Sequence, residues 1–136
     1  MKTDSEFYEN LLDILSDGVY AVDRDRRITY WNRGAERLTG YKSSEVVGKC
    51  CRDILMHQNE QGIALCTTEG CLAAKAMTEE HTYTEEHAYV EEVYLRHKDG
   101  RRMPILTYIS PIRDSKGRIV GAFEIFCNLA EIIGSK

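Results

Sequence analysis

The sequence predicts an α+β domain built on one five-stranded antiparallel sheet, with short helices on one face and an amphipathic helix at the N-terminus. Two observations predict this fold. Elements follow one another in the order helix, two strands, several short helices and three strands. The chain of 136 residues is 43% hydrophobic, which suits one core of ordinary size.

The first predicted element is an amphipathic helix over residues 5–16. Its apolar residues recur at intervals that place them on one helical face, and they are Phe7, Leu11, Ile14 and Leu15. Asp17-Gly18 follows and ends the helix. Residues 1–17 are therefore expected to form an N-terminal helix that precedes the main domain.

A β-hairpin is predicted next, from the β-rich runs 19–22 and 28–31 on either side of a short charged turn. Asn32 follows the second run at once, and asparagine is a good helix cap because its side-chain oxygen accepts a backbone hydrogen bond. We therefore expect a short helix over residues 33–39 that ends at Gly40.

Short helices and an irregular segment fill the middle of the chain. Ser43 is expected to cap a helix that ends at Gly48, and residues 72–77 are expected to form another. Residues 49–70 follow neither the helical nor the strand period, and they contain most of the cysteines.

Three strands are predicted at the C-terminal end, over residues 90–97, 103–112 and 119–126, separated by turns that contain Gly100 and Gly117. Side chains alternate between the two faces of a strand. One strand therefore presents Ile105, Thr107 and Ile109 opposite to Leu106 and Tyr108, and the next presents Ala122, Glu124 and Phe126 opposite to Phe123 and Ile125. Periodicity does not decide which set faces the helices, because both faces carry apolar residues.

A cofactor or ligand pocket is one interpretation of the residues that would face the helices. Its candidate residues are Trp31, Ile105, Thr107 and Ile109. Core packing is the alternative, above all for Trp31, because a large aromatic residue beside a helix cap commonly packs against its neighbours.

The middle segment contains a candidate metal site with the spacing C-x5-H-x8-C-x4-C, formed by Cys51, His57, Cys66 and Cys71. Thiolates and imidazole are the ligands that zinc, iron and iron–sulfur clusters prefer. Two alternatives remain: buried inert thiols, and a redox pair in which Cys66 and Cys71 form a reversible disulfide. Cys50 and Cys127 fall outside the pattern, and we assign them no role.

An acidic near-repeat precedes the last three strands, in which EEHTYT, EEHAYV and EEVYLR follow one another over residues 79–96. In an extended chain His81 and His87 would point to the same side, which would suit a carboxylate–imidazole metal patch. The alternative is a solvated face whose charges discourage edge-to-edge pairing.

Charge and composition exclude several classes of function. The net charge is −4 and the basic residues are scattered, so we expect no nucleic-acid partner. No apolar run is long enough to span a bilayer and the N-terminus does not resemble a signal peptide, so we expect a cytoplasmic segment without a membrane contact. Because there is no Gly-x-Ser-x-Gly elbow, Walker loop or Gly-x-Gly-x-x-Gly motif, we do not expect an enzyme.

The order and spacing of short motifs over residues 5–131 resemble a PAS domain, or sensory box. The motifs of the first half are DGVYAVD (17–23), ITYWN (28–32), AE (35–36), LTGY (38–41) and EVVG (45–48), and those of the second half are HKDG (97–100), Pro104, PI (111–112), Asp114, Gly117 and IVG (119–121). The resemblance implies the PAS fold over residues 18–128, with a core or pocket for a ligand, cofactor or partner. It also implies that residues 129–136 begin a linker to an output domain, with Asn128-Leu129-Ala130 where the family often has Asp-Ile-Thr.

The middle segment resembles a narrower PAS subgroup with a cysteine-bearing insertion, which precedes bacterial diguanylate cyclase (GGDEF) domains. The residues are Cys51 to His57, Gly62, Leu65-Cys66 and Cys71-Leu72. This resemblance implies signal transduction to a covalently attached diguanylate cyclase, with a sigma-54 regulator or a histidine kinase as alternative outputs. The family resemblance also implies a homodimer through the N-terminal helix, and the alternative is that this helix only covers its own sheet. The alternative functions are a ligand-free dimerisation module and a metal or redox sensor.

Overall fold

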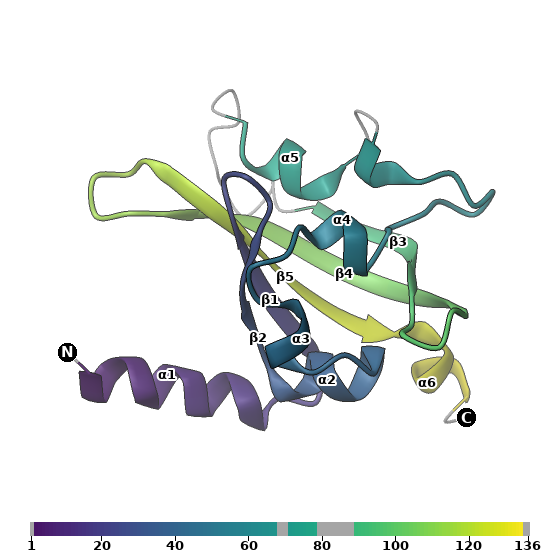
Figure 1. Cartoon of the computed structure of the whole chain (residues 1–136), viewed down its shortest axis with the longest axis horizontal. Helices are drawn as coiled ribbons and strands as arrows, with labels where there is room; N and C mark the ends of the chain where they lie inside the picture. Colours follow the sequence, from purple (N-terminus) through teal and green to yellow (C-terminus); the bar gives the residue numbers. More distant parts are fainter. Residues whose placement is uncertain (1, 68–70, 79–88, 135–136) are drawn as a thin grey trace.

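The framework of the molecule is one antiparallel sheet of five strands (Figure 1). The structure is a computed structural model that describes residues 2–67, 71–78 and 89–134. Its strands are β1 (Gly18–Asp23), β2 (Ile28–Trp31), β3 (Tyr89–Arg96), β4 (Arg102–Arg113) and β5 (Ile119–Asn128). They lie in the order β2-β1-β5-β4-β3, and every neighbouring pair is antiparallel. The predicted α+β fold with a five-stranded antiparallel sheet is confirmed.

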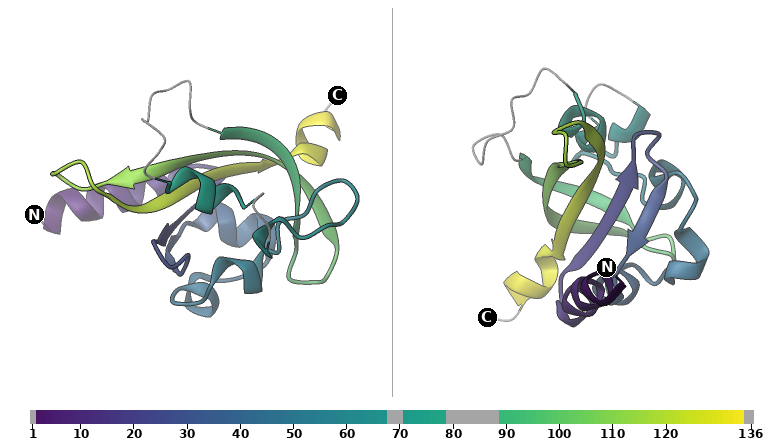
Figure 2. Two further views of the ribbon diagram at one scale, coloured as in Figure 1. Left: turned by 90° about the horizontal axis from the view of Figure 1, so that it is seen from above. Right: turned by 90° about the vertical axis from the view of Figure 1, so that its left-hand side faces the viewer.

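Short helices cover one face of this sheet (Figure 2). They are α2 (Arg33–Thr39), α3 (Ser43–Val46), α4 (Cys51–Ile54), the 3₁₀ helix η1 (Leu65–Thr67) and α5 (Leu72–Ala76). The N-terminal helix α1 (Lys2–Ile14) packs beside α2, and β5 continues directly into α6 (Leu129–Gly134). Within the described ranges, no helix is long and apolar enough to cross a membrane.

The inner face of the sheet is the one that the helices cover. Ile105, Thr107 and Ile109 of β4 are buried there, and so are the three alternating residues of β5, Ala122, Glu124 and Phe126. The opposite set is only half-buried: Leu106, Tyr108, Phe123 and Ile125. The alternation predicted the two sets, and the packing of the helices decides between them.

Asn32 ties three elements together, and its predicted role as a helix cap is confirmed. Its side-chain oxygen accepts hydrogen bonds from the backbone N–H groups of Ala35 and Val19, each at 2.8 Å. Its side-chain nitrogen donates to the carbonyl oxygens of Leu12 and Asp17, at 2.8 and 3.2 Å. The amide therefore fixes α1 and β1 to the start of α2.

The second short helix differs from its prediction at both ends. It runs over Ser43–Val46, and the residue at its N-cap is Lys42 rather than Ser43. Two carboxylates satisfy the first backbone donors: Lys42 N–H donates to Glu45 Oε1 at 3.0 Å and Ser43 N–H to Glu36 Oε2 at 2.7 Å. A serine hydroxyl is therefore not needed as the cap. His81 and His87 of the acidic near-repeat lie outside the described residues.

Candidate functional site

A buried carboxylate lies at the centre of the inner face. Glu124 is 1% exposed, and the pairing of β1 with β5 places Tyr20 directly opposite to it. The Tyr20 hydroxyl donates to Glu124 Oε1, and the hydroxyl of Thr107 on β4 donates to Oε2. His57 completes the set, with its Nε2 atom 3.1 Å from Oε2. Three side chains from separate parts of the chain thus converge on one carboxylate.

His57 is held in place by backbone pairing to its two neighbouring segments. Its carbonyl oxygen accepts a hydrogen bond from Leu65 N–H at 2.7 Å. The next residue, Gln58, exchanges two backbone hydrogen bonds with Tyr94 of β3, at 2.7 and 2.9 Å. These contacts fix the imidazole over the sheet, where it meets Glu124.

The charges of His57 and Glu124 stabilise each other. Burial alone would lower the pKa of His57, but the Glu124 carboxylate and the hydrogen bonds of the ring outweigh it and raise that pKa to about 10. Burial alone would raise the pKa of Glu124, and the charge of His57 with the three hydrogen bonds brings it below its ordinary value instead. The interior therefore contains an imidazolium–carboxylate pair.

The four residues of the candidate metal site line one small cavity beside this pair. Cys51, His57, Cys66 and Cys71 share it with Tyr20, Leu65, Ala73 and Glu124. Its volume is about 10 Å³, close to the minimum that holds one water molecule. Among the residues that the structure describes, no three His, Cys, Asp or Glu side chains are arranged to hold a metal ion. The metal site stays a prediction.

The three thiols at the cavity have different surroundings. Burial, more than the neighbouring thiols, raises the pKa of Cys51 far above its ordinary value, so this thiol stays protonated. Cys66 lines the cavity together with His57. Cys71 Sγ lies 3.4 Å from Nη1 of Arg26, and the same Nη1 donates to the Cys66 carbonyl oxygen at 3.1 Å. Cys66 and Cys71 thus have charged neighbours.

The four candidate pocket residues are all buried, and they occupy different surroundings. Trp31 packs against Tyr20 with the ring centres 5.4 Å apart, and its Nε1 donates to the Tyr41 carbonyl oxygen at 3.0 Å. Ile105 and Ile109 belong to the hydrophobic core. Thr107 contacts the polar network through Glu124. Their role as ligand-binding residues stays a prediction.

Sequence reasoning assigned no function to Glu124 or Tyr20. The sequence did contain a signal for Glu124, because the alternation along β5 places this carboxylate on the same face of the strand as Ala122 and Phe126. A carboxylate on the buried face of a strand needs donors, and it therefore marks a polar site. Tyr20 gave no such signal, because its role depends on the register of β1 against β5.

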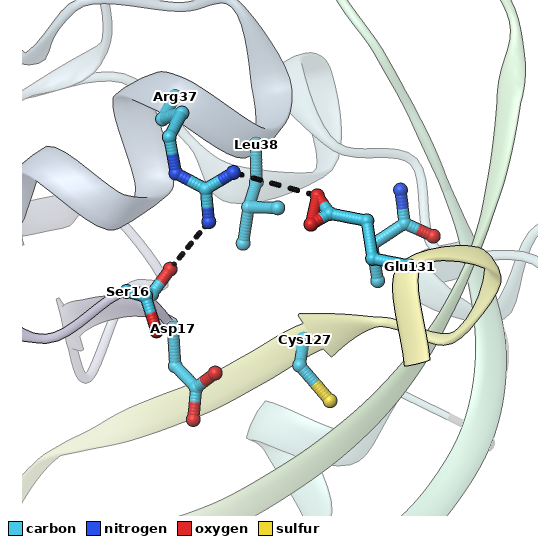
Figure 3. Close-up of a pocket in the computed structure, with 7 residues that line it drawn as sticks. Ser16, Asp17, Arg37, Leu38, Cys127 and Glu131 are labelled. Carbon is cyan, nitrogen blue, oxygen red and sulfur yellow. Dashed lines mark hydrogen bonds and ion pairs between the residues drawn. The ribbon is translucent and has the colours of Figure 1, made fainter. Parts of the chain in front are cut away.

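A second recess lies where the two ends of the domain meet (Figure 3). It is lined by Ser16, Asp17, Arg37, Leu38, Cys127, Asn128 and Glu131. Arg37 of α2 spans the recess: its Nη2 donates to the Ser16 carbonyl oxygen at 2.8 Å, and its Nη1 lies 3.4 Å from Glu131 Oε1 on α6. One side chain therefore contacts both the segment after α1 and the helix that leaves the sheet.

Comparison with known proteins agrees with this geometry. A family model described as "PAS domain" matches residues 16–131. The PAS domain of a protein from Colwellia psychrerythraea has the same fold, with a TM-score of 0.72 and 20% identity over 94% of this chain and 98% of that chain. No protein of curated function matches the chain.

Two further solved structures belong to signalling proteins. The PAS domain of nitrogen regulation protein NR(II) from Vibrio parahaemolyticus superimposes with a TM-score of 0.66 and 15% identity, over 89% of this chain and 96% of that chain. The LOV domain of the EL346 blue-light activated histidine kinase from Erythrobacter litoralis gives 0.62 and 22%, over 85% and 97%. At these identities the likeness concerns the fold.

Proposed function

Because this chain belongs to the PAS domain family, we propose that it is a signal-input domain that regulates an output domain attached through α6. PAS domains are sensory modules, so regulation rather than catalysis is the role of such a chain. The observation that carries the proposal is the course of β5. This central strand contains the buried Glu124 and continues directly into α6, so a change at the buried network can displace the exit helix.

The Arg37 contacts supply a weak connection of the kind that a two-state switch needs. The side chains of Arg37 and Glu131 are 54% and 51% exposed, so their ion pair contributes at most about 1 kcal/mol. A contact of this strength can break and re-form as the domain changes state, and its loss changes the balance of the two states. The recess in Figure 3 is therefore the proposed junction for transmission.

The output domain that we propose is a diguanylate cyclase, with a sigma-54 regulator or a histidine kinase as alternatives. Support comes from the resemblance of the cysteine-bearing segment to PAS domains that precede bacterial GGDEF domains. The solved structures add that domains of this fold occur in nitrogen regulation protein NR(II) and in a light-activated histidine kinase.

The test joins this chain through α6 to a diguanylate cyclase domain and measures cyclic di-GMP formation. We expect Arg37→Gln to change the basal rate about threefold or more, because it removes about 0.7 kcal/mol of bias between two states. Arg52→Gln is the matched control, since Arg52 is 50% exposed and its ion pair is with its neighbour Asp53. If Arg37→Gln and Glu124→Gln both leave the rate at the wild-type value, the chain does not control the output through α6.

A homodimer through α1 is our second proposal, and it rests on one observation. Four apolar side chains of this helix and the residue after it remain exposed, by 58%, 46%, 78% and 45%: Phe7, Leu11, Ile14 and Leu15. An apolar face of this kind marks a contact surface. A second copy of the chain is the proposed occupant, and two α1 helices would then cover each other's apolar faces.

A further inference from the structure

Residues 57–65 form a short hairpin between α4 and η1 that covers the buried carboxylate. The hairpin is closed at its base, where the His57 carbonyl oxygen accepts a hydrogen bond from Leu65 N–H at 2.7 Å. His57, Leu65 and the adjacent Cys66 line the small cavity that Glu124 also lines. This segment therefore forms one wall of the cavity, and its displacement would open the cavity to solvent.

The hairpin is attached at an edge of the sheet. Gln58 exchanges two backbone hydrogen bonds with Tyr94 of β3, at 2.7 and 2.9 Å, and β3 is an edge strand. Residues 60–63 lie beyond this contact and are exposed where the hairpin projects from the domain (Figure 1). An element that is joined to an edge strand by few hydrogen bonds opens at a lower free energy than the central strands do.

Arg102, at the start of β4, joins this hairpin to the sheet through its side chain. Its Nε donates to Gln58 Oε1 at 3.0 Å, and its Nη2 donates to the Asn59 carbonyl oxygen at 3.0 Å. The same guanidinium lies over the ring of Tyr94, 4.2 Å from the ring centre, in a cation–π contact. Because Arg102 is exposed, it can release all three contacts without disturbing the core.

The backbone at the base of the hairpin is strained. Met56 connects the end of α4 to His57, and its φ is +45°, in the left-handed region that a long side chain rarely adopts. Residues of this kind occur in switch segments, where the surrounding contacts hold them in place. The contacts of Gln58 and Arg102 supply that constraint here, so the closed hairpin stores strain that opening can release.

We propose that residues 57–66 form a lid over Glu124 and that Arg102 is its latch. The closed cavity has a volume of about 10 Å³, so a ligand larger than water reaches Glu124 only when the lid opens. Opening breaks the contacts of Arg102 and moves His57 away from the carboxylate. That a ligand uses this entrance rests on the signal-input role proposed above, whereas the opening itself does not depend on an output domain.

The test compares hydrogen exchange at single backbone amides, measured by NMR, in the wild-type chain and in Arg102→Ala. The reporters are the N–H groups of Gln58, Tyr94 and Leu65, because their hydrogen bonds break when the lid opens. We expect the variant to exchange about tenfold faster or more at all three. The amides of β5 should change by less than about twofold, because this strand lies between two others and is released only when the sheet unfolds.

Arg101→Ala is the matched control, because Arg101 is 66% exposed and its ion pair is with Asp99 in the adjacent turn. It should leave all of these exchange rates at the wild-type values. Unchanged exchange at Gln58 in Arg102→Ala would overturn the proposal, because Arg102 would then not hold the lid closed. Equal acceleration in β5 would overturn it too, because the variant would then have lost stability throughout the domain.

Alkylation of Cys66 with iodoacetamide measures whether opening reaches the cavity. Cys66 is 6% exposed, and the readout is the ratio of its rates in Arg102→Ala and the wild type, so the intrinsic reactivity of the thiol cancels. We expect this ratio to match the increase in exchange at Leu65, with the rate of Cys127 unchanged. Faster exchange without faster alkylation would show that the hairpin frays while the cavity stays closed, and would overturn the proposal. None of these outcomes bears on the Arg37 experiment.

Discussion

At the scale of single residues, the ion pair of His57 and Glu124 is the most unusual feature. Burying two charges costs more than their attraction returns unless hydrogen bonds satisfy the remaining groups. Here the carboxylate accepts from Tyr20, Thr107 and His57, and no buried side-chain nitrogen or oxygen in the described residues lacks a partner. The network therefore stabilises the fold only while both members keep their charges.

The pH dependence of stability follows from the two pKa shifts. The pKa of Glu124 is lowered from 4.5, so its contribution is complete above about pH 4.5 and is lost as the pH falls. The pKa of His57 is raised from 6.5 to about 10, so its contribution is complete below about pH 6.5 and is lost as the pH rises toward 10. We expect the free energy of unfolding, measured in urea, to be highest between these values and to fall from pH 6.5 to 9.

His57→Gln provides the control for this profile, because glutamine keeps a donor for Glu124 but does not titrate. The variant should be less stable than the wild type near pH 6, and its stability should change little between pH 6.5 and 9. Parallel profiles for the two proteins would show that His57 is not charged in the folded state.

The candidate site was only partly predictable at this scale. Cys51, His57, Cys66 and Cys71 lie within one short segment, and their proximity along the chain is enough to group them as one candidate site. Glu124 comes from another part of the chain, and it meets His57 because the neighbouring Gln58 pairs with Tyr94 of β3. Periodicity can place a carboxylate on one face of a strand, but it does not say which distant side chain donates a hydrogen bond to it.

At the scale of elements, the partners of the backbone hydrogen bonds explain which helices the sequence could predict. Asn32 and Gly40 bound α2 as expected, and Gly40 has a φ of +83°, which a glycine adopts without strain. The segment around α4 has little local signal because its backbone bonds are long-range: Cys51 N–H donates to Arg26, and Leu55 accepts from Arg96. Packing against distant strands, rather than propensity, holds it in place.

The junction at Asn32 gives a sharp prediction about stability. Asn32→Ala removes four hydrogen bonds from a fully buried site and leaves two backbone donors and two carbonyl oxygens without this partner. We expect a loss of about 2–4 kcal/mol in the free energy of unfolding.

Asn128→Ala is the matched control, because Asn128 accepts one hydrogen bond, from Ala130 N–H at 2.9 Å, at an exposed helix start. Its loss should cost about 0.5–1 kcal/mol. Equal effects in urea unfolding would mean that Asn32 acts as an ordinary cap and does not join α1 to the sheet.

At the scale of the whole molecule, the exposed apolar residues gather on α1 and not on the helices over the sheet. Phe7, Tyr8, Leu11, Ile14 and Leu15 account for most of the large exposed apolar side chains in the described part of the chain. The outer face of the sheet is also partly apolar, yet α1 packs against α2. This arrangement leaves the helix free for the proposed second copy.

Ile14→Glu tests the proposed homodimer, because Ile14 is 78% exposed and a charge there would be buried between two copies. We expect sedimentation velocity to show a dimer for the wild type and a dissociation constant at least about tenfold higher for Ile14→Glu. Ile63→Glu is the control, since Ile63 is also exposed, at 55%, but lies far along the chain from α1. A wild type that stays monomeric at millimolar concentration would contradict the proposal.

The central position of β5 also has a consequence during synthesis on the ribosome. Until Ile119–Asn128 has emerged, the β1–β2 and β3–β4 hairpins have no strand between them and cannot join into one sheet. A two-stranded ribbon is at best marginally stable alone, and its open edges can pair with other nascent chains. The domain should therefore fold late, after nearly all of it has left the exit tunnel, and a chain truncated before β5 should depend on chaperones to stay in solution.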